Sequence, residues 1–277
     1  MNISPETFGV HYDLDARFYH SLPGASASQL RKLWQSTPAH LKASLDEPRE
    51  ETPAMMMGTL AHSVILEPEK PLPGIVIPPD EYEPGKKWTN AAKVCKEWRA
   101  AREAEGLLVV KADEYNAVMG MARSIAAHPL AGPMLAYGRP EVSLVTMDEG
   151  NGVVVRARVD FVPLSGPTLM DIKTTASAAA SDFQRKAYDM GYHIQAALYL
   201  ALWNALTGEE RTGFQFIVVE NTPPHAVNVF ECEREFLERG ASDFKRALAT
   251  YAQCVRDDNW PAYPATMQQL NIPKWAV

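Results

Sequence analysis

The order of apolar and polar positions predicts a β-hairpin near the middle of the chain. An apolar-rich run extends from 153 to 162, with apolar and polar residues alternating from 155 to 161, and a second apolar-rich run follows from 168 to 174. Proline, serine and glycine between 163 and 167 are typical of a turn rather than of a continuous helix. Because successive side chains of a strand point to opposite faces, residues two apart share a face. The hairpin therefore has a core face and a face that carries charged side chains.

Similar patterns predict the rest of an α/β fold. β-Type runs at 141–147, 214–220 and 227–232 extend the hairpin into a central mixed sheet. Apolar residues at helical spacing predict helices that flank this sheet. These helices start near residue 28 and then cover 55–66, 91–104, 112–127, 181–206 with a break at Gly191, and 233–255. We expect residues 1–18 to be an extended lead-in and residues 19–277 to be a single domain.

Composition excludes several classes of protein. Of the 277 residues, 46% are hydrophobic and 22% are charged, as in ordinary globular proteins. No apolar run approaches the roughly 20 residues of a membrane helix, and no secretory signal is visible. Cys95, Cys232 and Cys254 lack a C-x-x-C spacing, which argues against a disulfide framework, a zinc ribbon or a four-cysteine iron–sulfur cluster. We expect a cytoplasmic protein with no membrane contact.

Asp160, Asp171 and Lys173 are the candidate reactive groups of the hairpin. Asp160 lies near the end of the first strand, while Asp171 and Lys173 share a face of the second. Two carboxylates at adjacent strand ends repel each other, and a divalent cation such as Mg²⁺ removes that conflict. The lysine can then stabilise developing negative charge or help deprotonate a water, which suits phosphodiester hydrolysis. In the alternative interpretation, Asp171 pairs with Lys173 or an arginine and nothing reacts.

Three ordered motifs favour the first interpretation. They are RVDF at 158–161, DIKTT at 171–175 and GYHIQAALYL at 191–200. In this order they resemble the PD-(D/E)xK nuclease superfamily, and more closely its RecE-type exonucleases (exodeoxyribonuclease VIII), over nearly the whole chain. The pattern D-x-K alone is weak, whereas the ordered series is specific. The resemblance implies a restriction-endonuclease-like core.

The resemblance also assigns roles to individual residues. It implies that Asp160, Asp171 and the Ile172 carbonyl hold a metal ion and that Lys173 orients or activates the attacking water. His62, in a G-x-x-x-H pattern, would be a further metal ligand. A lone histidine on an apolar helix is otherwise more often a core residue.

An acidic residue in the first core strand completes the implied active site. Glu141 occupies the matching position, at the start of the strand 141–147. Without the resemblance, Glu141 would be an ordinary charge at a strand edge. The implied cofactor is Mg²⁺, and because a histidine ligand also suits Mn²⁺, that ion can substitute.

Residues of the third motif are expected to position the substrate. Tyr192, Gln195 and Tyr199 fall at i, i+3 and i+7 and so form one stripe of a helix. The stripe could simply be a polar surface. Next to the D-x-K strand, the resemblance implies that Gln195 and Tyr199 face the site.

Two basic segments are candidate DNA contacts. The first helix begins near Ser28 and carries Arg31, and the N-terminus of a helix can bind a phosphate. Packing onto the sheet is the alternative role for this helix. Lys86 and Lys87 precede Trp88 in a local basic cluster, and an aromatic among lysines suits a DNA backbone with base stacking. A solvated helix face explains that cluster equally well.

The predicted function is a metal-dependent 5′→3′ exodeoxyribonuclease that acts on the ends of linear double-stranded DNA. The resemblance implies that it makes single strands for homologous recombination, with a single-strand annealing protein as partner, in a bacterial or phage-infected cell. It also implies a homo-oligomeric ring, a trimer or a tetramer.

Two alternatives stay open. One is an endonuclease or single-strand nuclease of the same superfamily, and the other is a non-catalytic DNA-binding scaffold. The formal net charge of −7 makes a broad DNA-binding surface unfavourable, so any such surface must be local.

Overall fold

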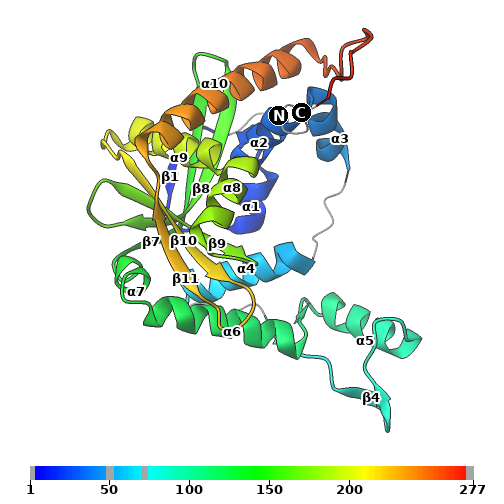
Figure 1. Cartoon of the computed structure of the whole chain (residues 1–277). Helices are drawn as coiled ribbons and strands as arrows, with labels where there is room; N and C mark the ends of the chain where they lie inside the picture. Colours follow the sequence, from blue (N-terminus) through cyan, green and yellow to red (C-terminus); the bar gives the residue numbers. More distant parts are fainter. Residues whose placement is uncertain (1–3, 48–52, 70–73, 273–277) are drawn as a thin grey trace.

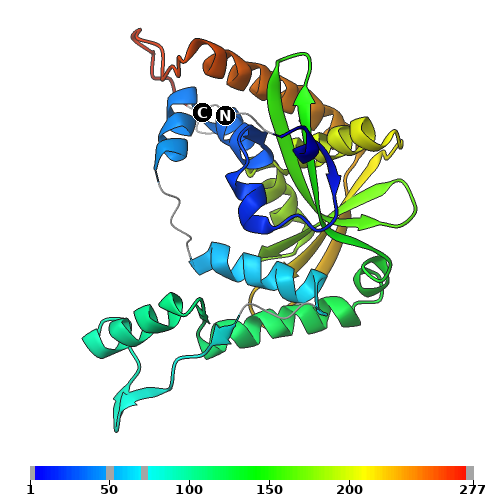
Figure 2. The same ribbon diagram turned by 180° about the vertical axis from the view of Figure 1, so that it is seen from behind.

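The computed structural model describes residues 4–47, 53–69 and 74–272. Within these ranges the chain forms a mixed sheet with helices on both faces and a smaller projecting arm (Figures 1 and 2). The predicted α/β fold is therefore confirmed.

The sheet has the strand order β1-β7-β8-β9-β10-β11, and β2 pairs with β8 beside this path. Its strands are β1 (Gly9–His11), β2 (Ala25–Ser26), β7 (Gly138–Asp148), β8 (Val153–Pro163), β9 (Thr168–Thr175), β10 (Gly213–Glu220) and β11 (Val227–Glu231). β7 and β8 form an antiparallel hairpin, whereas β9 and β10 run parallel. A parallel pair needs a crossover, and two helices supply it.

β8 and β9 form a fork. One edge of β8 pairs with β7 along its length. On its other edge, β9 pairs at Phe161, opposite Met170, whereas β2 pairs at Val155 and Arg156. Because a strand has only two edges, β2 lies between the diverging β8 and β9. The fork opens beside Asp160, the neighbour of Phe161.

Helices cover both faces of the sheet (Figures 1 and 2). The helices of the first face are α2 (Ala27–Gln35), α8 (Ala180–Asp189), α9 (Tyr192–Thr207) and α10 (Arg234–Asp257), which share one apolar core with the sheet. The second face packs against α4 (Pro53–Leu66), α6 (Ala112–Ala127) and α7 (Ala131–Met134). The remaining helical elements are η1 (Pro5–Thr7), α1 (Ala16–Ser21), α3 (Pro38–Asp46) and α5 (Lys93–Ala104).

Residues 74–111 form the projecting arm (Figures 1 and 2). At its base β3 (Ile75–Val76) pairs with β6 (Leu108–Val109), and beyond it β4 (Glu81–Glu83) and β5 (Lys86–Lys87) make a hairpin beside α5. The Trp88 ring meets the Trp98 ring edge-on at 5.0 Å, which ties the hairpin end to α5.

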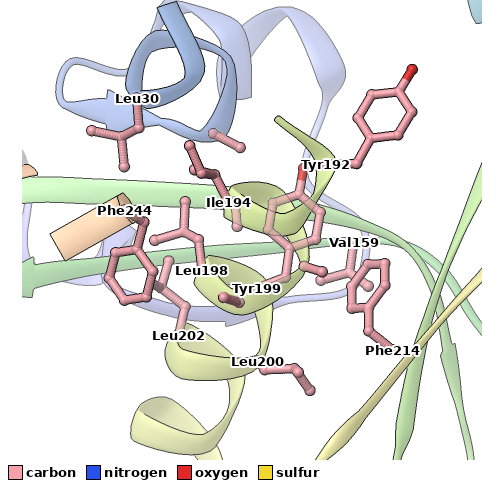
Figure 3. Packing of buried hydrophobic residues seen from close by; sticks show 14 of the residues in the cluster. Leu30, Val159, Tyr192, Ile194, Leu198, Tyr199, Leu200, Leu202, Phe214 and Phe244 are labelled. Atoms are coloured by element: carbon pink, nitrogen blue, oxygen red, sulfur yellow. The ribbon is translucent and has the colours of Figure 1, made fainter. Parts of the chain in front are cut away.

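α9 is the central helix of the first core. Leu198 is fully buried, and Figure 3 shows it beside Phe244 of α10, while the Tyr199 ring meets the Phe214 ring of β10 edge-on at 6.2 Å. A side chain at Gly240 of α10 would lie 2.0 Å from the carbonyl oxygen of His193 in α9. Glycine is thus required where the two helices approach most closely.

The N-terminal segment differs from the predicted lead-in. β1 pairs with β7 and adds a strand to the sheet, and α1 begins at Ala16. Three-residue strands are too short to show alternation, which explains why the sequence did not reveal β1. Among the described helices, none combines the length and the apolar character needed to cross a membrane.

Leu198→Ala should lower the free energy of unfolding by about 2–5 kcal/mol, because it removes a fully buried side chain and leaves a cavity. Denaturation with guanidinium chloride measures the change. The control is Leu164→Ala, whose side chain is 65% exposed, and it should change stability by no more than about 0.5 kcal/mol. Equal effects of the two substitutions would contradict the placement of α9.

Candidate active site

The site lies at the fork, where Asp160 replaces a missing backbone partner. β8 turns away from β9 beyond Phe161, and the Asp160 Oδ2 atom accepts a hydrogen bond of 2.8 Å from the backbone N–H of Ile172. A buried N–H without an acceptor would cost about 1–3 kcal/mol. The carboxylate is therefore fixed in position by the backbone of β9.

His62 comes from α4, on the second face of the sheet. Its Nε2 atom donates a 3.0 Å hydrogen bond to the Ile172 carbonyl oxygen. The other ring nitrogen, Nδ1, lies 3.4 Å from Asp160 Oδ2 and 4.0 Å from Glu141 Oε1. Because Nε2 holds the proton in the neutral ring, Nδ1 presents a lone pair to two carboxylates. A second proton or a metal cation resolves that repulsion.

Gly58, the glycine of the G-x-x-x-H pattern, does not mark a close approach of α4 to another described part of the chain. A side chain at Gly58 would meet nothing within 4 Å among the described atoms. The helix is instead placed by Leu60, Ala61 and Leu66, which are buried in the second core. His62 thus reaches the fork because its neighbours anchor α4.

Glu141 sits in a strained backbone position of β7. Its φ angle is +52°, in the left-handed region that costs a residue with a side chain about 1 kcal/mol or more. The register of the hairpin, with Pro140 opposite Phe161 and Val142 opposite Val159, places Glu141 across from Asp160. Such strain persists where the surrounding structure imposes it, often at functional sites.

Arg158 holds the Glu141 side chain. Its Nε atom donates a 2.6 Å hydrogen bond to Glu141 Oε2, and its terminal nitrogen donates to the Leu14 carbonyl oxygen at 3.1 Å. The other carboxylate oxygen, Oε1, is the one that faces His62. Sequence reasoning gave Arg158 no role, although its position two residues before Asp160 places both side chains on one face.

His62, Glu141 and Asp160 fit a divalent metal ion. One potential ligand atom from each lies within 4.8 Å of the others. Burial raises the pKa of Asp160 to about 7, and the Asp171 carboxylate is the next contributor. A raised carboxyl pKa means that the charged form lacks enough compensation, which a cation supplies. One nitrogen with carboxylate oxygens is a donor set that Mn²⁺ and Mg²⁺ both accept.

Asp171 and Lys173 lie next to this cluster, on β9. Asp171 is fully buried and contacts both the Lys173 ammonium and the side-chain amide of Gln195. Burial lowers the pKa of Lys173, but the Asp171 and Asp160 carboxylates outweigh it, so the net shift is upward. The neighbouring carboxylates therefore favour the charged ammonium form of Lys173. Asp171 was also predicted to be a metal ligand, but it is not one of the three residues whose ligand atoms lie within 4.8 Å of one another.

Gln195 links the acidic and basic parts of the site. Its amide nitrogen donates to Asp171, while its oxygen accepts from Lys173 Nζ at 3.2 Å and from Arg31 at 3.3 Å. The Tyr192 ring lies beneath both cations, 4.7 Å from Lys173 and 5.6 Å from Arg31. Cation–π contacts of this kind contribute about 0.5–2 kcal/mol each.

Tyr199 packs below the site rather than in its opening. Its side chain is buried and meets the Phe214 ring edge-on. Burial raises the pKa of Tyr199 well above its usual value, and the nearby Tyr19 and Asp171 side chains raise it further. The structure therefore separates Tyr199, a packing residue, from Gln195, which contacts the reactive groups.

The remaining predicted DNA contacts are divided between two places. Ser28 is exposed in the first turn of α2, and its hydroxyl lies 3.0 Å from that of Ser26, one turn before Arg31. Lys86 and Lys87 are instead on the projecting arm (Figure 1), where Lys86 pairs with Glu83 at 2.6 Å. The fold thus brings Arg31, but not the lysine pair of β5, to the residues around Asp171.

Comparison with known proteins is consistent with this geometry. The model of a family described as "PDDEXK-like domain of unknown function (DUF3799)" matches residues 26–271. A structure described as "Putative exonuclease" from Eubacterium rectale shares 14% sequence identity and a TM-score of 0.59, with 92% of this chain and 97% of that chain covered.

A phage-related exonuclease from Haemophilus somnus 129PT has 13% identity and a TM-score of 0.37, over 86% of this chain and 97% of that chain. No curated protein sequence matches the chain. The first structural likeness shows the fold, and the family match shows the superfamily, so the predicted restriction-endonuclease-like core is confirmed.

Metal affinity should rise with pH through about 7, because Asp160, whose pKa is raised to about 7, must lose its proton to bind a cation. Below that pH each unit should cost up to about tenfold in affinity, and above it the affinity should level off. Calorimetric titration with Mn²⁺ at pH 6, 7 and 8 measures this dependence. Asp160→Asn should abolish it, whereas the exposed-loop variant Glu149→Gln should retain it. A flat profile for the unmodified protein would refute the assignment of Asp160.

Proposed function

Because the chain belongs to the PDDEXK-like family of domains of unknown function (DUF3799), we propose that it is a metal-dependent deoxyribonuclease that degrades linear duplex DNA from its 5′ ends. The observation that carries the proposal is the fork. There His62, Glu141 and Asp160 converge beside the Asp171–Lys173 pair. Asp171 and Lys173 do pair, as the non-catalytic interpretation expects. That interpretation does not explain why the Glu141 and Asp160 carboxylates both face His62.

In the proposed site, His62 Nδ1, Glu141 and Asp160 hold the cation, which we propose to be Mg²⁺, with Mn²⁺ as a substitute. The Ile172 carbonyl, predicted to be a further ligand, instead accepts the hydrogen bond from His62 Nε2 on the opposite side of the ring. When bound, such an ion supplies positive charge for the phosphate and lowers the pKa of a coordinated water. Arg158 keeps one oxygen of Glu141 occupied and so presents the other oxygen to the ion.

Lys173 supplies the second positive charge. Asp171 and the Gln195 oxygen hold its ammonium, and the Tyr192 ring supports it from below. A fixed cation is worth most where charge grows during the reaction, here on the non-bridging oxygens of the cleaved phosphate. Asp171 and Gln195 act on the reaction through Lys173.

Exonuclease action at 5′ ends is the finer part of the proposal. Its support is the RecE-type motif series together with the name of the E. rectale protein, which shares the fold. Arg31 and Ser28, next to Gln195 and at the start of α2, are proposed to contact the DNA strand near its end. Lys86 and Lys87 on the arm are proposed to contact DNA farther from the cleavage site.

The biological setting is proposed from the same resemblance. An enzyme that removes one strand from a duplex end leaves the other strand for a single-strand annealing protein during recombination. A homo-oligomeric ring, trimeric or tetrameric, would keep such an enzyme on the DNA between successive cleavages.

End-labelled DNA tests this function. Linear duplex labelled at either the 5′ or the 3′ end, and covalently closed circular duplex, are incubated with Mg²⁺ or with EDTA. We expect loss of linear DNA from 5′ ends with Mg²⁺ only. Cutting of the circle would indicate an endonuclease, and binding without cleavage would indicate a scaffold.

Asp160→Asn and Lys173→Met should each lower the cleavage rate at least about 100-fold, because they remove a metal ligand and the fixed cation. Asparagine still accepts the hydrogen bond from Ile172, so Asp160→Asn should fold normally. Initial rates on linear duplex measure the effect, and thermal melting checks the fold. Lys245→Met, on the surface of α10, is the control and should retain full activity. Full activity in Lys173→Met would exclude this site.

A further inference from the structure

We propose that Lys186 of α8 binds the phosphate next to the cleaved one on the same DNA strand. The inference rests on the proposed nuclease function and adds a substrate contact that the sequence motifs do not include. Three observations support the inference. They are the position of Lys186 relative to Lys173, the hydrogen bond that holds the Lys186 ammonium, and the access of solvent to Lys186.

Lys186 is placed at the end of the catalytic strand. Its Nζ atom donates a 3.0 Å hydrogen bond to the hydroxyl of Thr175, the last residue of β9. Thr175 is two residues after Lys173, so the two side chains share a face, about 7 Å apart along the strand. Because Lys186 is bonded to Thr175, its ammonium is brought to the face of β9 that carries Lys173.

Aromatic packing connects α8 to the surroundings of Lys173. Phe183 of α8 packs against Phe216 and Tyr192, with ring centroids 6.0 and 6.2 Å apart. The Lys173 ammonium lies over these same two rings, 5.9 Å from Phe216 and 4.7 Å from Tyr192. The packing that fixes α8 therefore fixes Lys186 relative to Lys173.

Lys186 forms no direct ion pair within the described part of the chain. Among the described residues, no carboxylate oxygen lies within the 4.0 Å of an ion pair with its Nζ atom. Asp182, one turn earlier on α8, accepts from the Ser177 hydroxyl at 2.8 Å instead. Burial lowers the pKa of Lys186, and the nearby Lys173 lowers it further, as expected of two cations in one field.

Hydrogen bonds hold in place the segment that contains Thr175, the partner of Lys186. The Thr175 carbonyl oxygen accepts from the Asn221 N–H at 2.8 Å, and the Glu220 side chain accepts from the Ala178 N–H at 3.0 Å. These bonds tie the segment after β9 to the end of β10. A cation held in place before the ligand arrives loses little freedom on binding, so its contact with a phosphate retains most of its strength.

Solvent reaches Lys186 from the outside of α8. The residue lines a shallow surface hollow of about 420 Å³, together with Asp182, Arg185, Asp189 and Met190. The outer rim carries one basic and two acidic side chains, so the hollow as a whole does not attract DNA. Lys186, at the inner side toward β9, is the group that a strand bound at Lys173 would meet.

The test compares Lys186→Met with Lys186→Arg on linear duplex DNA over a series of KCl concentrations. Removing the contact should raise KM about tenfold with little change in kcat, as for a binding contact that is equal before and during the reaction. The slope of log KM against log[KCl] should also fall by about one, since one phosphate contact is lost. Lys186→Arg should keep KM and the salt slope close to their normal values. Thr175→Val should change both in the same direction as Lys186→Met, but by less.

Lys245→Met is the matched control, because it removes an exposed lysine from the surface of α10 and should keep the normal KM and slope. If the wild type cleaves DNA and Lys186→Met has the same salt slope, the inference is overturned but the proposed function stands. A wild type that cleaves no DNA would overturn the proposed function, and the inference with it. A purely structural role for Lys186 would lower the melting temperature but leave the salt slope unchanged.

Discussion

One hydrogen bond organises the site: the Asp160 side chain accepts from the Ile172 backbone where β8 and β9 separate. A diverging pair of strands leaves buried backbone groups without partners, and folding requires that they be satisfied. By filling that requirement with a carboxylate, the fold places negative charge inside the sheet at a fixed point. His62, Glu141 and Lys173 are then arranged around this charge by three different elements.

The concentration of buried charge at the fork opposes stability and favours function. Asp160, Asp171 and Glu141 repel one another, and the shift of the Asp160 pKa to about 7 expresses that repulsion together with burial. The same arrangement favours the binding of a cation, because a cation would offset the repulsion between these carboxylates. The strained backbone of Glu141 and its bond from Arg158 show that neighbouring strands hold the acid there.

The sequence allowed the residues that meet at the fork to be predicted. Strand alternation placed Asp171 and Lys173 on one face, and the resemblance added Asp160, Glu141 and His62. The sequence did not show the left-handed backbone of Glu141, since no turn residue marks that position. β2 was missed because two residues carry no period, although β2 fills the fork. Lys186 was also missed, because a hydrogen bond between a crossover helix and a strand end follows from packing.

The amide of Gln195 spans the ion pair of Asp171 and Lys173. Its nitrogen faces Asp171 and its oxygen faces Lys173 and Arg31, so its two ends are not interchangeable. The oxygen can accept only from the two cations, and the nitrogen can donate only to the carboxylate, so a reversed amide would lose all three hydrogen bonds. The charges of the site therefore fix which way this side chain is turned, and the amide in turn ties Arg31 of α2 to β9.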